Sequence, residues 1–121
     1  MTYDEYNEFC GSLQATSYVV QWGNSHVWKV VDKVFAVGGW GKTGDPAFNF
    51  KVSELNFNVL RDEPGFRPAP YMAARGMKWI QQYDVSKERD EDLAYYLRES
   101  HRIVSLGLTK KKQKEFGLNQ S

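Results

Sequence analysis

Hydrophobic and polar residues alternate with a period of two over four stretches in the first half of the chain, at residues 17–22, 26–31, 34–40 and 47–52. These stretches are rich in β-branched and aromatic residues, as half-buried strands are. The segments between them are short and consist of turn-forming residues, which leaves no room for crossover helices. The pattern therefore predicts four antiparallel strands joined as a meander.

A different period precedes these strands. Thr2 is followed three residues later by Glu5, which is the spacing of a capping box at the start of a helix. Apolar residues then recur at positions 6, 9, 10 and 13, so one stripe of the predicted helix faces a core. Cys10 lies on this stripe near the end of the helix, where the helix dipole disfavours a thiolate. We therefore expect Cys10 to be a core residue and not a nucleophile.

The second half of the chain continues with a short helix after Ser53, which Pro64-Gly65 ends. Residues 66–72 contain two prolines and predict an edge or interrupted strand, whereas residues 77–83 alternate as a regular strand. Three acidic residues at 90–92 open a longer helix that Gly107 closes. The order α-ββββ-α-ββ-α predicts an α+β fold in which helices cover an antiparallel sheet.

The chain has 121 residues, which suits one domain, and we assign residues 1–108 to it and residues 109–121 to a basic C-terminal tail. Its formal net charge is +1, but residues 61–121 carry twelve Lys/Arg and nine Asp/Glu, whereas residues 1–60 carry four and six. The lysines at 110–114 predict a solvated, frayed end, with a phosphate-contacting tail as the alternative. A single cysteine and the lack of a long apolar run indicate a cytoplasmic protein that does not enter a membrane.

No segment carries a self-sufficient catalytic centre. Residues 36–43 match a loose phosphate-loop pattern, but Gly44-Asp45-Pro46 follow at once and oppose the helix that such a loop requires. His26 and His101 lack partners at metal-binding spacing, and the acids at 88–92 are explained by a helix start. We therefore expect no enzymatic activity, no cofactor and no metal.

Aromatic and basic residues are neighbours at Trp28-Lys29, Phe50-Lys51 and Lys78-Trp79. Because side chains alternate across a strand, aromatics that face the core leave these lysines on the opposite face of the sheet. That face is either an ordinary solvated surface or one that follows a phosphate backbone.

The chain also resembles the MmcQ/YjbR family of small bacterial proteins of unknown function. The resemblance is carried by residues 1–5, Phe9-Cys10, Trp22-Gly23, residues 28–30 and 33–36, Asn49-Phe50-Lys51, the proline-rich segment 64–72, Trp79, and the helix at 100–108 with the lysines after it. It implies a CyaY-like α+β fold, whose hairpins in some members have been likened to a double-wing DNA-binding motif. Two departures from the family pattern are Val31-Asp32, where a glycine is usual, and Leu108-Thr109, where leucine-proline is usual.

The leading functional hypothesis is a double-wing DNA-binding module for double-stranded DNA, with residues 73–76 as a wing. Its phosphate contacts are expected from Lys29, Lys33, Lys51, Arg75, Lys78, Lys110, Lys111 and Lys112. The alternative is a protein-interaction or chaperone-like module that uses an exposed sheet face or edge, with Trp22, Trp40 and Tyr71 as anchors. A third reading is a small-ligand pocket around Trp22, Tyr71 and Trp79.

Overall fold

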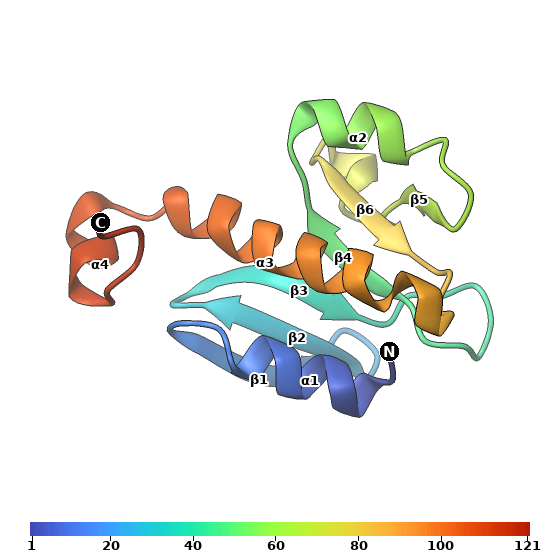
Figure 1. Cartoon of the computed structure of the whole chain (residues 1–121), viewed down its shortest axis with the longest axis horizontal. Coiled ribbons are helices and arrows are strands. Elements are labelled where there is room, and N and C mark those ends of the chain that lie inside the picture. Colours follow the sequence, from blue (N-terminus) through green and yellow to red (C-terminus); the bar gives the residue numbers. More distant parts are fainter.

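A computed structural model describes all residues, 1–121, and its centre is one sheet of six strands in the order β1-β2-β3-β4-β6-β5 (Figure 1). Every neighbouring pair of strands is antiparallel. The elements are α1 (Tyr3–Gly11), β1 (Thr16–Gln21), β2 (Ser25–Val30), β3 (Lys33–Gly38), β4 (Phe48–Lys51), α2 (Glu54–Leu60), β5 (Phe66–Pro68), η1 (Ala73–Arg75), β6 (Trp79–Gln82), η2 (Lys87–Arg89), α3 (Asp90–Leu106) and α4 (Lys110–Glu115). The predicted α+β class and element order are confirmed, and so is the meander of the first four strands.

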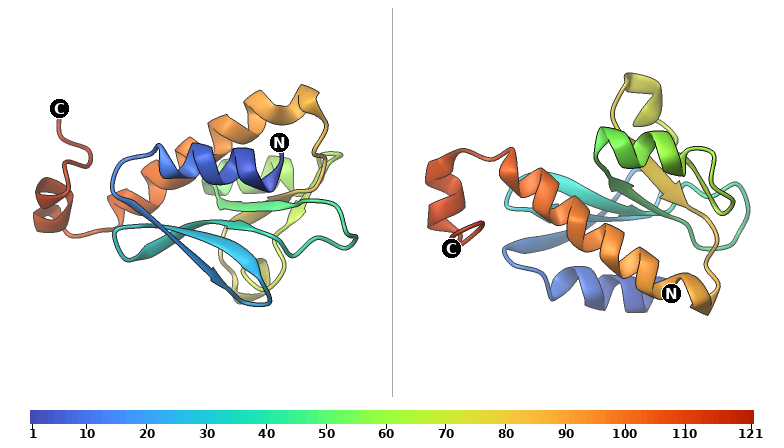
Figure 2. Two further views of the ribbon diagram at one scale, coloured as in Figure 1. Left: turned by 90° about the horizontal axis from the view of Figure 1, so that it is seen from below. Right: turned by 45° about the horizontal axis from the view of Figure 1, so that its top comes forward.

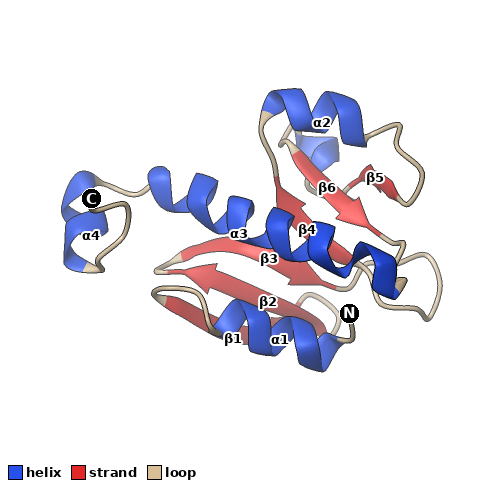
Figure 3. Ribbon diagram, in the orientation of Figure 1, coloured by secondary structure: helices blue, strands red, loops and turns tan.

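The helices α1 and α3 lie on one face of the sheet, and the other face of β1, β2 and β3 carries no helix (Figures 2 and 3). The main core fills the space between the sheet and these helices. It includes Phe35, Phe48 and Phe50 from the strands and Leu93 and Leu97 from α3, all essentially without solvent exposure. We call the helix-covered face the inner face of the sheet and the opposite face the outer face.

The first helix begins where the sequence predicts. The Thr2 hydroxyl accepts a hydrogen bond from the Glu5 amide at 3.1 Å, and the Glu5 carboxylate accepts one from the Thr2 amide at 2.9 Å, which completes the capping box. Cys10 is fully buried in the main core. Burial raises the pKa of the Cys10 thiol far above its ordinary value, so the thiol stays protonated.

Ser100 of α3 joins the longest helix to the middle of the sheet. Its hydroxyl donates to the carbonyl oxygen of Phe35 in β3 at 2.6 Å and accepts from the Lys51 amide in β4 at 2.8 Å. The side chain has no solvent exposure. Ser100 therefore satisfies two backbone groups at the point where β3 and β4 diverge, and it sets how α3 lies on the inner face.

Residues 109–121 differ from the frayed tail that the sequence predicts. The Thr109 hydroxyl accepts from the Lys112 amide at 3.1 Å and caps α4, so Thr109 begins a helix. Leu118 is buried in the main core and Gln113 is also buried. The Gln113 side chain donates to the Leu108 carbonyl at 2.8 Å. The segment is basic, and it packs against the rest of the chain through Leu118.

The turn between β2 and β3 places its strain on the valine. Val31 has a φ of 59°, a left-handed conformation that is a clear outlier for a β-branched residue, whereas Asp32 does not have a positive φ. A two-residue hairpin with a positive φ at its first position only is a type II′ turn, in which glycine is favoured at that position. The positive φ of this hairpin therefore falls on Val31 and not on Asp32.

Candidate functional site

The outer face carries a second, small hydrophobic cluster. The strand register places Val37, Asn49 and Gln81 side by side on this face, and it pairs Lys51 with Trp79 next to them. Val27, Val37, Ala69 and Trp79 form the cluster, and all four side chains are buried. Since no helix covers this face, the burial comes from the segment between β5 and β6.

That segment is folded over the outer face. The Ala69 amide donates to the Trp79 carbonyl at 3.0 Å, which ends the pairing of β5 with β6. The chain then forms the short helical turn η1, and Gly76 closes it with a φ of 79°. Residues 73–76, predicted as a hairpin-sized wing, therefore form one turn of 3₁₀ helix and not an extended tip.

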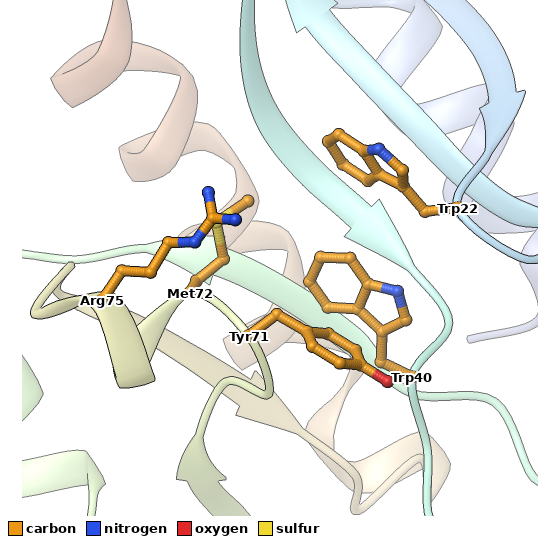
Figure 4. A pocket seen from close by; sticks show the side chains of 5 residues that line it. All are labelled: Trp22, Trp40, Tyr71, Met72 and Arg75. Atoms are coloured by element: carbon orange, nitrogen blue, oxygen red, sulfur yellow. The ribbon is translucent and has the colours of Figure 1, made fainter.

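Three aromatic residues meet where this segment approaches the tip of the β1–β2 hairpin. The rings of Trp22 and Trp40 are 5.8 Å apart, and those of Trp40 and Tyr71 are 5.1 Å apart with edge-to-face geometry. Together with Met72 and Arg75 they line a cavity of about 430 Å³ (Figure 4). We call these five residues the aromatic cage.

The three cage aromatics lie in turns and not in strands, contrary to the prediction. Strands β1, β3 and β5 end at Gln21, Gly38 and Pro68, so each aromatic lies just beyond a strand end. Trp22, Trp40 and Tyr71 all have left-handed backbones, with φ values of 53°, 65° and 68°. This conformation costs an L-residue roughly 1–2 kcal/mol, and such strain concentrates at functional sites. The signal in the sequence is a neighbouring glycine or proline: Trp22-Gly23, Gly39-Trp40-Gly41 and Pro70-Tyr71.

A buried polar network holds the backbone of Trp40 in place. The Gln81 side-chain amide donates to the Trp40 carbonyl and to the Asn49 side-chain oxygen, both at 3.0 Å. Asn49 donates to the Gly39 carbonyl at 3.0 Å, and the Arg67 guanidinium donates to Gln81 at 2.7 Å and to the Trp40 carbonyl at 3.1 Å. Gln81 and Asn49 have no solvent exposure. The network converges on two loop carbonyls and so fixes one wall of the cage.

The charged residues that the strands contribute to the sheet are all basic. None of the six strands contains an aspartate or a glutamate, although they contain Lys29, Lys33, Lys51 and Arg67. The stretch from residue 64 to residue 83, which supplies three cage residues, also has no acid. The fifteen acidic residues lie on helices and connecting loops. The strands therefore add cations and no carboxylates to the outer face. One acid lies at its edge, because Asp45 of the β3–β4 loop lines a hollow together with Arg67 and Gln81.

The eight cations that the sequence singles out do not form one surface. Lys29 and Lys51 lie on the outer face, because their strand partners Ser17 and Trp79 face outward, and Arg75 lines the cage. The Lys78 ammonium lies 5.0 Å from the centre of the Phe57 ring of α2, on the inner side. The remaining four are Lys33 at the β2–β3 turn and Lys110, Lys111 and Lys112 on α4.

Lys112 forms an ion pair with Asp32 at 3.1 Å, so one of these cations is already partnered within the chain. This hydrogen-bonded contact lowers the pKa of Asp32. The Arg75 guanidinium, in contrast, makes no hydrogen bond or ion pair with the rest of the chain, and only the Arg75 backbone amide is bonded, to the Met72 carbonyl.

Trp79 is not an accessible anchor. It is only 2% exposed and belongs to the cluster beneath the cage, and its indole nitrogen has no hydrogen-bond partner. Trp22 and Tyr71, in contrast, are 49% and 68% exposed. Sequence reasoning missed Met72, which carries no sign of its role because a methionine beside two alanines has no distinguishing pattern.

The other candidate groups have structural partners. The Tyr18 hydroxyl and His26 Nδ1 are 2.7 Å apart, and His101 Nε2 lies 2.7 Å from the Gln14 carbonyl oxygen. No three His, Cys, Asp or Glu side chains lie together in a way that would hold a metal ion. The loop after β3 leads into β4 and not into a helix, although Lys42 and Thr43 line a second hollow of about 440 Å³ with Arg67 and Tyr83. No helix has the length and apolar character that a membrane crossing requires.

Comparison with known proteins identifies two solved structures with a similar fold and one matching family. No curated protein matches the sequence. The crystal structure of the Deinococcus radiodurans protein DR2400, with a domain of the class DUF419, matches with a TM-score of 0.82 and 23% identity, over 99% of this chain and 91% of that one. A crystal structure of a protein from Pseudomonas syringae matches with a TM-score of 0.61 and 17% identity, over 83% of this chain and 99% of the other. The YjbR family model matches residues 11–103, and the chain therefore belongs to the YjbR family.

Proposed function

We propose that this YjbR-family protein is a DNA-binding module that contacts phosphates through the outer face of its sheet, without catalysis. The observation that carries the proposal is the combination of sheet strands that contain cations but no acids with exposed aromatic residues at the border of the outer face. Lys and Arg that neutralise phosphates supply most of the affinity of such modules. Aromatic side chains add contacts that solvated lysines alone do not provide.

In this proposal the double wing consists of the β1–β2 tip and the β5–β6 connection. Both reach the same cavity, one through Trp22 and the other through Tyr71 and Arg75 (Figure 4). Lys29, Lys51 and Arg75 are the proposed phosphate contacts, and Lys33 with the α4 lysines forms a separate basic region at the β2–β3 end. Lys78 is left out of the contact set because it lies over Phe57 on the inner side.

The experiment is a fluorescence anisotropy titration of a labelled mixed-sequence DNA at about 50 mM and about 200 mM salt. The double variant Lys29→Gln/Arg75→Gln is expected to weaken binding and to reduce the slope of log K against log salt by about 2, since each phosphate contact contributes about 0.9 on duplex DNA. The matched control is Arg61→Gln/Lys87→Gln, which removes the same charge from the helix side. No binding by the wild type at low salt, or equal losses in both double variants, would refute the proposal.

A second candidate is a protein-interaction module. It is favoured by the half-exposed Trp22 and Tyr71 and by β1, an edge strand whose Val20 is 49% exposed. Aromatic anchors and a free strand edge are the usual features of peptide docking. The salt dependence of the affinity distinguishes the two candidates. The affinity of a partner that docks on apolar anchors changes little between low and moderate salt, whereas the affinity for phosphates falls steeply.

A further inference from the structure

We infer that the aromatic cage receives an unpaired nucleobase of a single-stranded nucleic acid, with the adjoining phosphate on Arg75. The inference rests on the proposed function and makes it more specific. A duplex keeps its bases stacked inside the helix, so a duplex-binding face has no use for an open aromatic cavity.

The shape of the cage suits a flat aromatic ligand. Trp22 stands on one side of the cavity, Met72 and Arg75 stand on the other, and Trp40 and Tyr71 lie between them (Figure 4). The cavity of about 430 Å³ lies within the ~300–1,000 Å³ range of small-molecule sites. The exposed faces of Trp22 and Tyr71 leave aromatic surface free for a further ring to stack on.

The chemistry of the cage suits a nucleobase with a negatively charged phosphate next to it. Four of the five lining residues are apolar or aromatic and the fifth is a cation, with no carboxylate among them. The Arg75 guanidinium has no partner within the chain, so all its donors are available to a phosphate. No side-chain amide lines the cavity to read the edge of a base, and the cage is therefore expected to accept several bases.

The surroundings favour a strand over a free nucleotide. A free nucleotide needs its phosphates enclosed, but the cage offers one cation and no loop of converging amides. Further cations lie outside the cage on the same face. Gln21, which precedes Trp22, pairs with Ser25 at the start of β2. Lys29 lies four residues farther along β2, and at 3.3 Å per residue this is about 13 Å from Ser25. A chain of phosphates leaving the cage along the outer face would reach it.

The backbone keeps the cage aromatics in place before a ligand arrives. All three have left-handed φ values, and the Gln81 network holds the Trp40 carbonyl. An aromatic platform that is already ordered loses little side-chain freedom when a base stacks on it. This preorganisation is what a stacking site requires, whereas a purely electrostatic surface does not.

The test compares four labelled or competing probes on the full chain: a single strand of about 12 nucleotides, its duplex, the same strand with abasic sites, and a mononucleotide. Anisotropy reports affinity, and the tryptophan fluorescence reports stacking on Trp22 and Trp40. The single strand is expected to bind at least tenfold more tightly than the duplex and the abasic strand, with quenched tryptophan emission. The mononucleotide is expected to compete only weakly.

Tyr71→Ala is the decisive variant, because its side chain is 68% exposed and its removal leaves the core intact. It is expected to weaken single-strand binding about tenfold and to weaken duplex binding by a smaller factor, whereas Tyr71→Phe retains wild-type binding of both. The matched control Tyr95→Ala removes an aromatic of 50% exposure from α3 and is expected to change neither.

Equal affinity for single strand, duplex and abasic strand, with no effect of Tyr71→Ala, would overturn the inference while the proposed function stands. Absence of binding to every nucleic acid would overturn both. A mononucleotide that binds as tightly as the strand would assign the cage to a free nucleotide and overturn the strand as its ligand.

Discussion

Gln81 and Gln82 offer a matched pair of substitutions that tests whether the polar network holds the cage. Both glutamines lie in β6, and their exposures are 0% and 1%. Gln81 faces outward and is bonded to Arg67, Asn49 and the Trp40 carbonyl. Gln82 faces inward, where its amide makes longer contacts of 3.2 and 3.4 Å to carbonyls and its oxygen has no partner.

The expected cost of Gln81→Leu follows from what it leaves unpaired. The substitution removes the donor to the buried Asn49 side-chain oxygen and the acceptor of the Arg67 Nε–H. A buried group without a partner, here the Asn49 oxygen, costs roughly 1–3 kcal/mol, and the lost hydrogen bond from the charged, half-buried Arg67 is worth about 1.5–3 kcal/mol before water replaces part of it, so we expect a loss of about 3 kcal/mol. That is a large part of a total stability on the order of 6–18 kcal/mol for a chain of this length.

Gln82→Leu is expected to cost less than about 1 kcal/mol, because it also removes a buried oxygen that has no hydrogen bond. The two carbonyls that it releases belong to the half-exposed Asp84 and Arg89, where water replaces the lost donor.

The assay is urea unfolding followed by circular dichroism, with the slope m compared between variants. At an m of about 2 kcal/mol per molar, Gln81→Leu is expected to lower the midpoint by about 1.5 M and Gln82→Leu by less than about 0.5 M. Gln81→Leu is also expected to weaken ligand binding by the cage, since the wall at Trp40 is no longer held. Equal midpoints for the two variants would refute the reasoning that the network, and not burial alone, stabilises this wall.

Val31→Gly is expected to change stability by less than about 1 kcal/mol, because relief of a left-handed cost of roughly 1–2 kcal/mol is offset by the added backbone entropy of glycine and by the lost packing of the partly buried Val31 side chain on the main core; a loss of more than about 2 kcal/mol in urea unfolding would contradict this. Ser100→Ala should lower the urea midpoint by the equivalent of about 1–3 kcal/mol, because the Phe35 carbonyl and Lys51 amide lose their shared partner. Hydrogen bonds from Ser86 and the nearby Arg89 lower the pKa of Asp84 below its ordinary 3.8. The contribution of Asp84 to the free energy of unfolding is therefore present at neutral pH and is lost as the pH falls through the lowered pKa; an unshifted Asp84 in a carboxyl NMR titration would disprove this prediction. Cys10 should resist thiol reagents until the protein unfolds, and rapid labelling of the native protein would count against its burial.

The sequence alone determined the features that depend on neighbouring residues. The Thr2–Glu5 spacing predicted the start of α1, and the alternation in the first half predicted four strands within one or two residues of their ends. The prolines at 68 and 70 predicted an edge strand or an interrupted strand, and the sheet order shows that β5 is an edge strand. Such signals are local because capping, alternation and proline geometry act within a few residues.

Only the tertiary structure decided which face each cation occupies. Lys78 and Trp79 are neighbours like Phe50 and Lys51, but Trp79 pairs with Lys51, and so the aromatic of one pair shares a face with the lysine of the other. A shift of one residue in register exchanges the two faces, and no local pattern specifies that register. The alternation predicted that Lys29, Lys51 and Lys78 share the face opposite the core, whereas in the structure Lys78 lies over Phe57 on the inner side.

Local sequence patterns could not predict the aromatic cage either, because long-range contacts determine it. Its aromatics come from three connections far apart in the chain, and each has a backbone conformation that bulky residues avoid when only local preferences act. Trp40 is held there by Gln81, 41 residues later in the sequence. Local patterns thus determined the strands and helices of this protein, whereas long-range hydrogen bonds and packing decided where its exposed aromatic residues meet.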